Sequence, residues 1–296
     1  MFQQILFPTD FSDSARCSGV AVRALSRHFS GTIHLIHVDE ERAMGMHSSD
    51  DLIRFMNEVD TRRKQWMEEM AADLSKDGFK VELSRLEGLA SEEILKYAEA
   101  HAIDLIVLGT VGHTSLKERL LGSTSRAILR EADCPVLTLN TRQMLPPDWS
   151  PSRILFPTDL SPTSSKGRQL IAPLARSVQS DVTLLSVLKV PIYIPAMPGE
   201  APVSATKQAF EVARGRAEAG LRALSRQPEW EGIEIHTDTL LAGDTADGIA
   251  RYATENAHGL VVLPRQGRGA LRSLFFGRVA EHVVKLTHCP VLTFRV

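Results

Sequence analysis

The chain has 296 residues, of which 43% are hydrophobic and 24% are charged, and its net charge is −2. This is the composition of a globular rather than a disordered protein, and it shows no charge excess that favours nucleic acid or an anionic membrane. The three cysteines indicate neither a disulfide framework nor a zinc site. The start of the chain leaves no room for the apolar core of a signal peptide, and the sequence contains no run of about 18 apolar residues that could cross a bilayer. We therefore expect a protein of the reducing cytoplasm.

The first half of the chain alternates short apolar runs with longer amphipathic stretches, a pattern typical of strands that alternate with helices. In chain order, we expect a strand at 5–7, a helix capped by Ser12 or Asp13, a strand at 33–38, a long helix with Leu52, Phe55, Val59, Trp66, Met70 and Leu74 on its buried side, a strand at 79–86, a helix opening at Ser91, a strand at 104–109, a helix at 123–130 and a strand at 135–139. Continuous apolar strands joined by helices predict an α/β fold, in which a parallel five-stranded sheet with right-handed crossovers carries helices on both faces.

Two sequence words occur twice and in the same order. ILFPTD at 5–10 returns at 154–159, an offset of 149, and CPVLT at 134–138 returns at 289–293, an offset of 155. The chain is therefore two copies of one domain, and the second copy has gained six residues.

The repeat sets the domain boundaries. We predict an N-terminal domain at 1–140, a linker rich in Pro, Asp and Ser at 141–152, and a C-terminal domain at 153–296. The six extra residues are expected in the Pro-rich stretch 191–202.

The segment between the fourth strand and the next helix contains three glycines and a run of hydroxyl residues. Glycines let a backbone approach a ligand closely, and N–H and O–H donors at the start of a helix favour an anion such as phosphate. From these residues alone, turn glycines followed by a Ser/Thr helix cap are an equally good interpretation. The residues concerned are Gly109, Gly112, Gly122, Ser123, Thr124 and Ser125.

The spacing of this segment, G-x2-G-x9-G-S, resembles the nucleotide loop of the universal stress protein (UspA) family. The words PTD at 8–10, LIHV at 35–38 and CPVL at 134–137 are similar to other marks of that family. The resemblance implies two Rossmann-like sheets of the adenine nucleotide alpha-hydrolase type, each with strand order 3-2-1-4-5. It also implies a ligand in the crevice between strands one and four, where open α/β sheets bind their ligands.

The same resemblance implies a site for ATP, ADP or AMP, with or without Mg²⁺, in the N-terminal domain. The residues implied near the adenine and ribose are Pro8, Thr9, Asp10 and Val38. Those implied along the ribose and phosphates are Gly109, Thr110, Gly112, His113, Gly122, Ser123, Thr124 and Ser125. Asp10 also has a purely structural interpretation as a helix cap after the first strand.

The second copy departs from the family pattern in its loop. Pro264 stands at the position of Gly109 and Arg278 at that of Ser123, whereas the counterparts of Asp10, Val38, Gly112 and Gly122 are kept as Asp159, Val187, Gly267 and Gly277. Proline lacks an N–H, so we expect that this copy does not hold a triphosphate in the family manner. Two alternatives stay open: a solvated basic loop, or phosphate binding by the side chains of Arg265, Arg268, Arg272 and Arg278.

Three classes of function are compatible with these patterns. We favour a nucleotide-binding regulatory protein of the stress response, with at most slow ATP hydrolysis and no assigned catalytic or metal-binding residue. The alternatives are an ATP-using enzyme, such as an adenylating one, and a flavin-carrying electron-transfer subunit. A Walker-type phosphate loop and an SGGxDS loop after the first strand are both absent from the sequence.

The last strand of each copy, at 136–139 and 291–294, is an apolar edge that needs covering. The family resemblance implies pairing through this strand. We therefore expect the two copies to form an intramolecular pseudo-dimer, and two chains could associate further as a homodimer.

Overall fold

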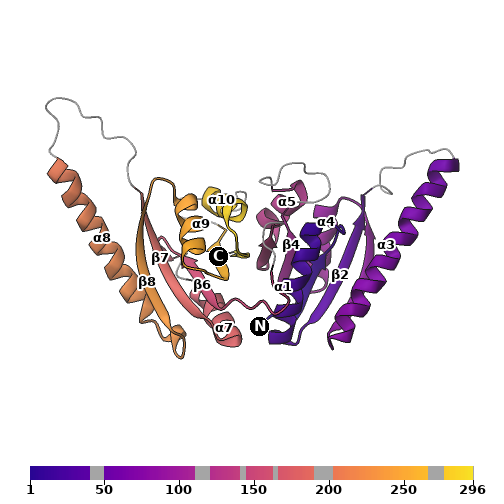
Figure 1. Cartoon of the computed structure of the whole chain (residues 1–296), viewed down its shortest axis with the longest axis horizontal. Coiled ribbons are helices and arrows are strands. Elements are labelled where there is room, and N and C mark those ends of the chain that lie inside the picture. The colour runs from indigo at the N-terminus through magenta and orange to yellow at the C-terminus, as the bar shows by residue number, and fades with distance from the viewer. Residues whose placement is uncertain are drawn as a thin grey trace, which may run out of the picture. The chain divides into compact units, whose positions relative to one another are not determined.

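The computed structural model describes residues 1–40, 50–110, 121–140, 145–162, 166–189, 203–265 and 277–295. The chain divides into two compact units, Met1–Trp149 and Ser150–Val296. Each unit is a parallel sheet with helices on both faces (Figure 1), so the predicted fold class is confirmed.

The first unit has strand order β3-β2-β1-β4-β5, as predicted, and every described strand pair in it is parallel. From β1 the next strands along the chain are added on one side of the sheet, and from β4 they are added on the other side; β1 and β4 themselves pair through Ile5 and Leu105. The carboxyl ends of these two strands therefore form the switch point of the sheet. The elements are β1 (Gln4–Pro8), α1 (Asp13–Phe29), β2 (Thr32–Asp39), α3 (Asp50–Lys76), β3 (Lys80–Glu87), α4 (Ala90–Ala100), β4 (Leu105–Gly109), α5 (Ser123–Glu131) and β5 (Val136–Leu139).

The second unit repeats this order as β8-β7-β6-β9-β10. Its long helix α8 lies against β8 and β7, much as α3 lies against β3 (Figure 1). The elements are β6 (Arg153–Pro157), α7 (Arg168–Val178), β7 (Asp181–Lys189), α8 (Val203–Ser225), the 3₁₀ helix η1 (Pro228–Trp230), β8 (Ile235–Ala242), α9 (Thr245–Glu255), β9 (Leu260–Pro264), α10 (Arg278–Leu286) and β10 (Val291–Phe294).

The central strands form the core. Ile5 and Leu6 of β1 and Leu105 and Ile106 of β4 are completely buried. An apolar run of this kind is covered on both faces of the sheet, so no alternating polar face develops. The strand ends, where the apolar runs stop, are left to carry polar groups.

Trp66 is not a core residue, contrary to the prediction. Its side chain is 42% exposed, and the buried residues in the part of α3 whose side chains are described are Met67, Ala71 and Leu74. Leu74 is buried as predicted, whereas Met67 and Ala71 are buried in place of Trp66 and Met70, because a large apolar residue on the boundary of a helical stripe is indistinguishable by spacing from one at its centre. The side chains of Leu52 and Phe55 lie outside the described part of the structure. Trp66 instead packs on the ring of Phe11, with 5.5 Å between ring centroids.

Most of the six extra residues of the second copy lie elsewhere than predicted. The buried positions Ala217, Leu221 and Leu224 of α8 match those of α3 at an offset of 150. The sheet register, in contrast, places Ile235 of β8 at the position of Val81 in β3, an offset of 154. Four extra residues therefore lie between α8 and β8. The predicted stretch, 191–202, is outside the described residues.

The extra residues form η1 and contribute to the core of the second unit. Trp230 is 3% exposed, and its indole N–H donates to the carbonyl oxygen of Leu224 at 2.9 Å. Glu229 accepts a hydrogen bond from Arg168 of α7 at 2.6 Å. The insertion is thus a packed structural element.

The second unit also buries a histidine that titrates far from its usual range. His258 is 5% exposed, with Nε2 at 3.1 Å from Thr183 Oγ1, and its Nδ1 atom has no hydrogen-bond partner in the described structure. Burial, and then the charge of Arg153, lower the pKa of His258 to about 4. The corresponding residue of the first unit is the buried Ile103.

We expect His258 to destabilise the fold in mild acid. The unfolded chain binds a proton on this side chain below about pH 6.5 whereas the folded chain does not until about pH 4, so stability falls as the pH is lowered through this window. At pH 5 the loss is about 2 kcal/mol relative to pH 7. Urea denaturation at both pH values measures it: His258→Ile should lose less stability in acid than the wild type, and a variant of the exposed His288 should behave as the wild type.

Candidate functional site

A tight turn follows β1. Thr9 Oγ1 accepts the N–H of Phe11 at 3.1 Å, and Asp10 Oδ1 accepts the N–H of Ser12 at 3.0 Å. Phe11 adopts the left-handed region with φ 63°. Ser12 is the N-cap of α1, since its Oγ accepts the N–H of Ala15 at 3.2 Å. Of the two predicted caps, Ser12 and Asp13, Ser12 is therefore the one used. Asp10, which was also considered as a helix cap, caps the turn instead.

The second unit contains the same turn. Thr158 Oγ1 accepts the N–H of Leu160 at 3.0 Å, and Asp159 Oδ1 accepts the N–H of Ser161 at 3.0 Å. Leu160 has φ 59°. The repeated PTD word therefore has a structural cause in both units, and keeping Asp159 needs no bound ligand.

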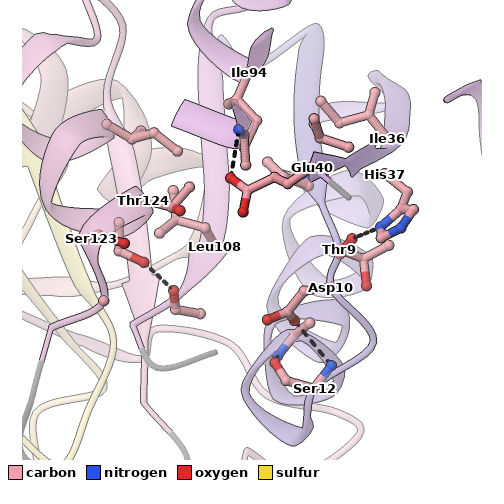
Figure 2. Close-up of a pocket in the computed structure, with 18 of the residues that line it drawn as sticks. Thr9, Asp10, Ser12, Ile36, His37, Glu40, Ile94, Leu108, Ser123 and Thr124 are labelled. Atoms are coloured by element: carbon pink, nitrogen blue, oxygen red, sulfur yellow. Dashed lines mark hydrogen bonds between the residues drawn. The ribbon is translucent and has the colours of Figure 1, made fainter. Parts of the chain in front are cut away.

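A cavity of about 350 Å³ opens at the carboxyl ends of β1, β2 and β4 in the first unit. Figure 2 shows Asp10 on one side of it and Ser123 and Thr124 on the other. Its volume lies in the range of small-molecule sites. Nine residues named from the sequence line it: Pro8, Thr9, Asp10, Val38, Gly109, Gly122, Ser123, Thr124 and Ser125.

Three other residues named from the sequence are not in the described lining. Thr110 is 4% exposed and supports the loop through its backbone. Its N–H donates to the carbonyl of Leu139 at 2.7 Å, and its own carbonyl accepts the N–H of Gly122 at 2.8 Å. Gly112 and His113 lie outside the described residues.

The start of α5 divides its polar groups between the protein and the cavity. The N–H of Gly122 is used by Thr110, and Ser125 Oγ donates to the carbonyl of Gly109 at 2.8 Å. Gly122 is the N-cap and provides no side-chain cap. Among the described residues, the N–H groups of Ser123 and Thr124 have no recorded acceptor. The N–H of Ser125, which also lines the cavity, likewise has no recorded acceptor, so these amides are free donors at the helix N-terminus.

Glu40 and Arg63 also line the cavity, although no sequence word contains them, and so does His37, which falls in the LIHV word but was given no role. His37 Nδ1 lies 2.8 Å from the carbonyl oxygen of Thr9, so this nitrogen carries a proton and donates. The ring of Phe11 packs on that of His37, with 4.8 Å between centroids. His37 thereby ties the end of β2 to the turn after β1.

The end of β2 also contributes to a group of ionisable residues that we name the Asp39 cluster: His37, Asp39, Asp60, Arg63 and Arg85. The carboxylate of Asp39 is 4% exposed and lies 3.2 Å from Arg63 Nη1, 2.6 Å from Arg85 Nη2 and 3.2 Å from His37 Nε2. Arg85 also pairs with Asp60, and hydrogen bonds to Asp60 and Asp39 raise the pKa of Arg85. A buried carboxylate surrounded by cations is the arrangement that offsets its desolvation.

The second unit lacks this cluster. Ser186 and Thr239 occupy the paired positions of His37 and Arg85, and Leu188 occupies that of Asp39. Comparing the two copies position by position is the signal that could have revealed the cluster. The family words do not reveal the cluster, because Asp60 and Arg63 of α3 and Arg85 of β3 lie outside all of these words.

The loop frame of the second unit is nevertheless retained. Arg265 takes the place of Thr110: its N–H donates to the carbonyl of Phe294 at 2.8 Å, and its carbonyl accepts the N–H of Gly277 at 2.7 Å. The Arg265 side chain is 3% exposed, with Nε at 3.4 Å from Thr293 Oγ1, so it is not part of a solvated loop. Arg278 opens α10 and is exposed.

Pro264 ends β9, and Asp159 and Val187 keep the places of Asp10 and Val38 at the ends of β6 and β7. Gly267, Arg268 and Arg272 lie outside the described residues. In the part of the chain that the structure describes, no helix is long and apolar enough to span a membrane.

A parallel sheet of order 3-2-1-4-5 defines each unit as a doubly wound α/β domain, and the first unit has a ligand-sized cavity at its switch point. A family model described as the universal stress protein family matches residues 1–140 and again 151–295. The chain therefore belongs to the universal stress protein family and carries its domain twice.

Individual relatives agree with this assignment. Universal stress protein MJ0577 of Methanocaldococcus jannaschii is 32% identical over 157 residues, which cover 48% of this chain and 97% of that protein. Universal stress protein YxiE of Bacillus subtilis is 29% identical over 146 residues, covering 46% and 98%. The crystal structure of a universal stress protein from Archaeoglobus fulgidus matches 99% of this chain and 98% of its own, with a TM-score of 0.69 and 18% identity, and shows the shared fold.

Proposed function

We propose that the first unit binds an adenine nucleotide, namely ATP, ADP or AMP, and that the protein acts as a nucleotide-dependent regulator of the stress response. One observation carries the proposal: the uncapped N-terminus of α5, with the free amides of Ser123 and Thr124, opens into a cavity of about 350 Å³. Free amides at the positive end of a helix favour a phosphate.

The opposite part of the cavity suits a nucleoside. Ile36, Leu108 and Ile94 provide apolar surface for a base. Asp10 uses only Oδ1 in its turn, which leaves Oδ2 to accept a hydrogen bond from a ribose hydroxyl. The distribution of groups therefore matches the two chemical ends of a nucleotide.

Magnesium would be held mainly by the nucleotide. Among the described residues, no group of three His, Cys, Asp or Glu side chains could hold a metal ion. Mg²⁺ commonly keeps several water ligands and binds through substrate phosphates, so the proposed cofactor, if it accompanies ATP, depends on the phosphates placed at α5.

For the second unit we propose that no triphosphate binds in the family manner. Pro264 removes an N–H from the end of β9, and Arg278 replaces the serine at the start of the helix with a long side chain. Binding of a smaller anion by arginine side chains is the alternative for this unit.

An ATP-using enzyme with slow hydrolysis is the second candidate for the first unit, because two carboxylates, Asp10 and Glu40, line the cavity and could orient a water. We favour a binding protein over an enzyme, since the residues assigned to the ligand form hydrogen bonds or line the cavity and do not include a nucleophile with its general base. The cytoplasmic location and the pairing of copies stay predictions.

Nucleotide stoichiometry tests the proposal. Native mass spectrometry and isothermal titration calorimetry of the full chain with ATP should give one nucleotide per chain. Two would contradict the assignment of the second unit, and none would contradict that of the first. Rapid ATP turnover would favour the enzyme, and a visible flavin absorbance in the purified protein would favour electron transfer.

A further inference from the structure

The starts of three helices line the cavity of the first unit, and that of α1 is capped by the side chain of Ser12. Ala90 of α4 and Ser123 of α5 both line it. Neither helix has a side-chain cap from its own N-cap residue, which is Leu89 for α4 and Gly122 for α5. Since each helix start favours an anion, a nucleoside phosphate could in principle place its phosphates at either one.

Glu40 fills one of the two. It follows the end of β2, and its Oε1 accepts the N–H of Ala90 at 2.8 Å. Figure 2 shows its carboxylate reaching from the end of β2 into the cavity, between Ile94 and Leu108. Its second carboxylate oxygen has no recorded partner in the described structure. The protein thus supplies α4 with an anion of its own, inside the cavity.

In the second unit the equivalent helix, α9, is capped in a different way. The N-cap of α9, at the position of Leu89, is Asp244, whose Oδ1 accepts the N–H groups of Ala246 at 2.8 Å and Asp247 at 3.2 Å. The position of Glu40 is taken by Lys189. One copy caps the helix locally, and the other moves the carboxylate to the strand end, where it forms part of the cavity wall.

We infer that Glu40 sets the direction in which a nucleoside phosphate enters the cavity. Its carboxylate keeps phosphate from the N-terminus of α4 by occupancy and by charge repulsion, so that the phosphates lie at α5. Its free oxygen accepts a hydrogen bond from an N–H or O–H of the base or sugar. The inference rests on the proposed nucleotide site and adds to it a residue that selects ligand orientation.

The test uses two partial ligands with opposite expected responses. Adenosine and inorganic tripolyphosphate are titrated separately into the full chain by isothermal titration calorimetry, with ATP as the reference. Glu40→Ala should weaken adenosine and ATP about tenfold through the lost acceptor, and should strengthen tripolyphosphate at least about threefold because a second helix start is free. Glu40→Gln, which keeps the size and the oxygen acceptor, should retain adenosine and strengthen tripolyphosphate.

The matched control gives α4 an aspartate at its N-cap position, as α9 has in Asp244. Glu40→Ala with Leu89→Asp returns a carboxylate to α4 outside the cavity lining, so tripolyphosphate binding should return to the wild-type value while adenosine stays weak. If wild type binds ATP but the Glu40 variants move both probes together, or neither, the inference is overturned. If wild type binds no ATP, the proposed nucleotide site itself fails.

Discussion

Replacing Gly122 with valine is expected to abolish nucleotide retention while the chain still unfolds cooperatively. Gly122 has φ −60° and ψ 156°, a region that valine adopts readily. The nearest atom to an added Cβ is the carbonyl oxygen of Thr110 at 3.5 Å, an ordinary contact. The two γ-methyl groups would then compete with a phosphate for the space beside Ser123 and Thr124. Loss of two charge-assisted hydrogen bonds corresponds to a rise in Kd of about a hundredfold or more.

Gly277→Val is the matched control, since Gly277 is the N-cap of α10 and its N–H makes the same bond to the preceding loop. Calorimetric titration with ATP and a thermal melt are measured on both variants. The control should bind ATP as the wild type does. Unchanged ATP affinity in Gly122→Val would show that the phosphates do not lie at α5.

The fold was predictable because the strands carry their signal locally. The buried runs of β1 and β4 appear in the sequence as uninterrupted apolar words, and the copy-to-copy repeat fixes which words are strands. The strand order came from the family resemblance rather than from any spacing, and the sheet has that order. The location of the inserted residues was missed, because Pro-rich composition marks a loop but does not measure its length relative to the other copy.

The site was predictable where a motif covers it and not elsewhere. Asp10 and Ser123 fall in family words and line the cavity, whereas Glu40 and Arg63 line it from outside any word. Their contacts are made across 24 to 50 residues of chain, Arg63 with Asp39 and Glu40 with Ala90. No periodicity encodes such pairs, since they depend on which strand ends meet in space.

Two glycines of the predicted nucleotide loop, Gly109 and Gly122, differ in the reason why glycine stands there. The three glycines of the loop were interpreted together as points of close ligand approach. An added Cβ at Gly122 has room, but one at Gly109 would lie 2.0 Å from Ser14 Oγ, 2.7 Å from its Cβ and 2.9 Å from its backbone carbon. Gly109 therefore lets α1 pack against β4, and its Cβ direction points into the protein.

Gly109→Ala should accordingly be a stability variant, lowering the free energy of unfolding by about 3 kcal/mol. Ser14 is 1% exposed, and since its backbone carbon is one of the clashing atoms, rotating its side chain cannot relieve the clash. Urea denaturation measures the loss. Gly122→Ala, with its nearest contact at 3.5 Å, should change stability by about 0.5 kcal/mol or less.

Ligand binding separates this packing role from a binding role. Folded Gly109→Ala should bind ATP with a Kd close to that of the wild type, and adding Ser14→Gly should recover part of the lost stability because it removes the two closest atoms. In the second unit the counterpart of Gly109 is Pro264, and the counterpart of Ser14 lies outside the described residues. A stable Gly109→Ala chain that no longer binds ATP would instead place the ligand against this residue.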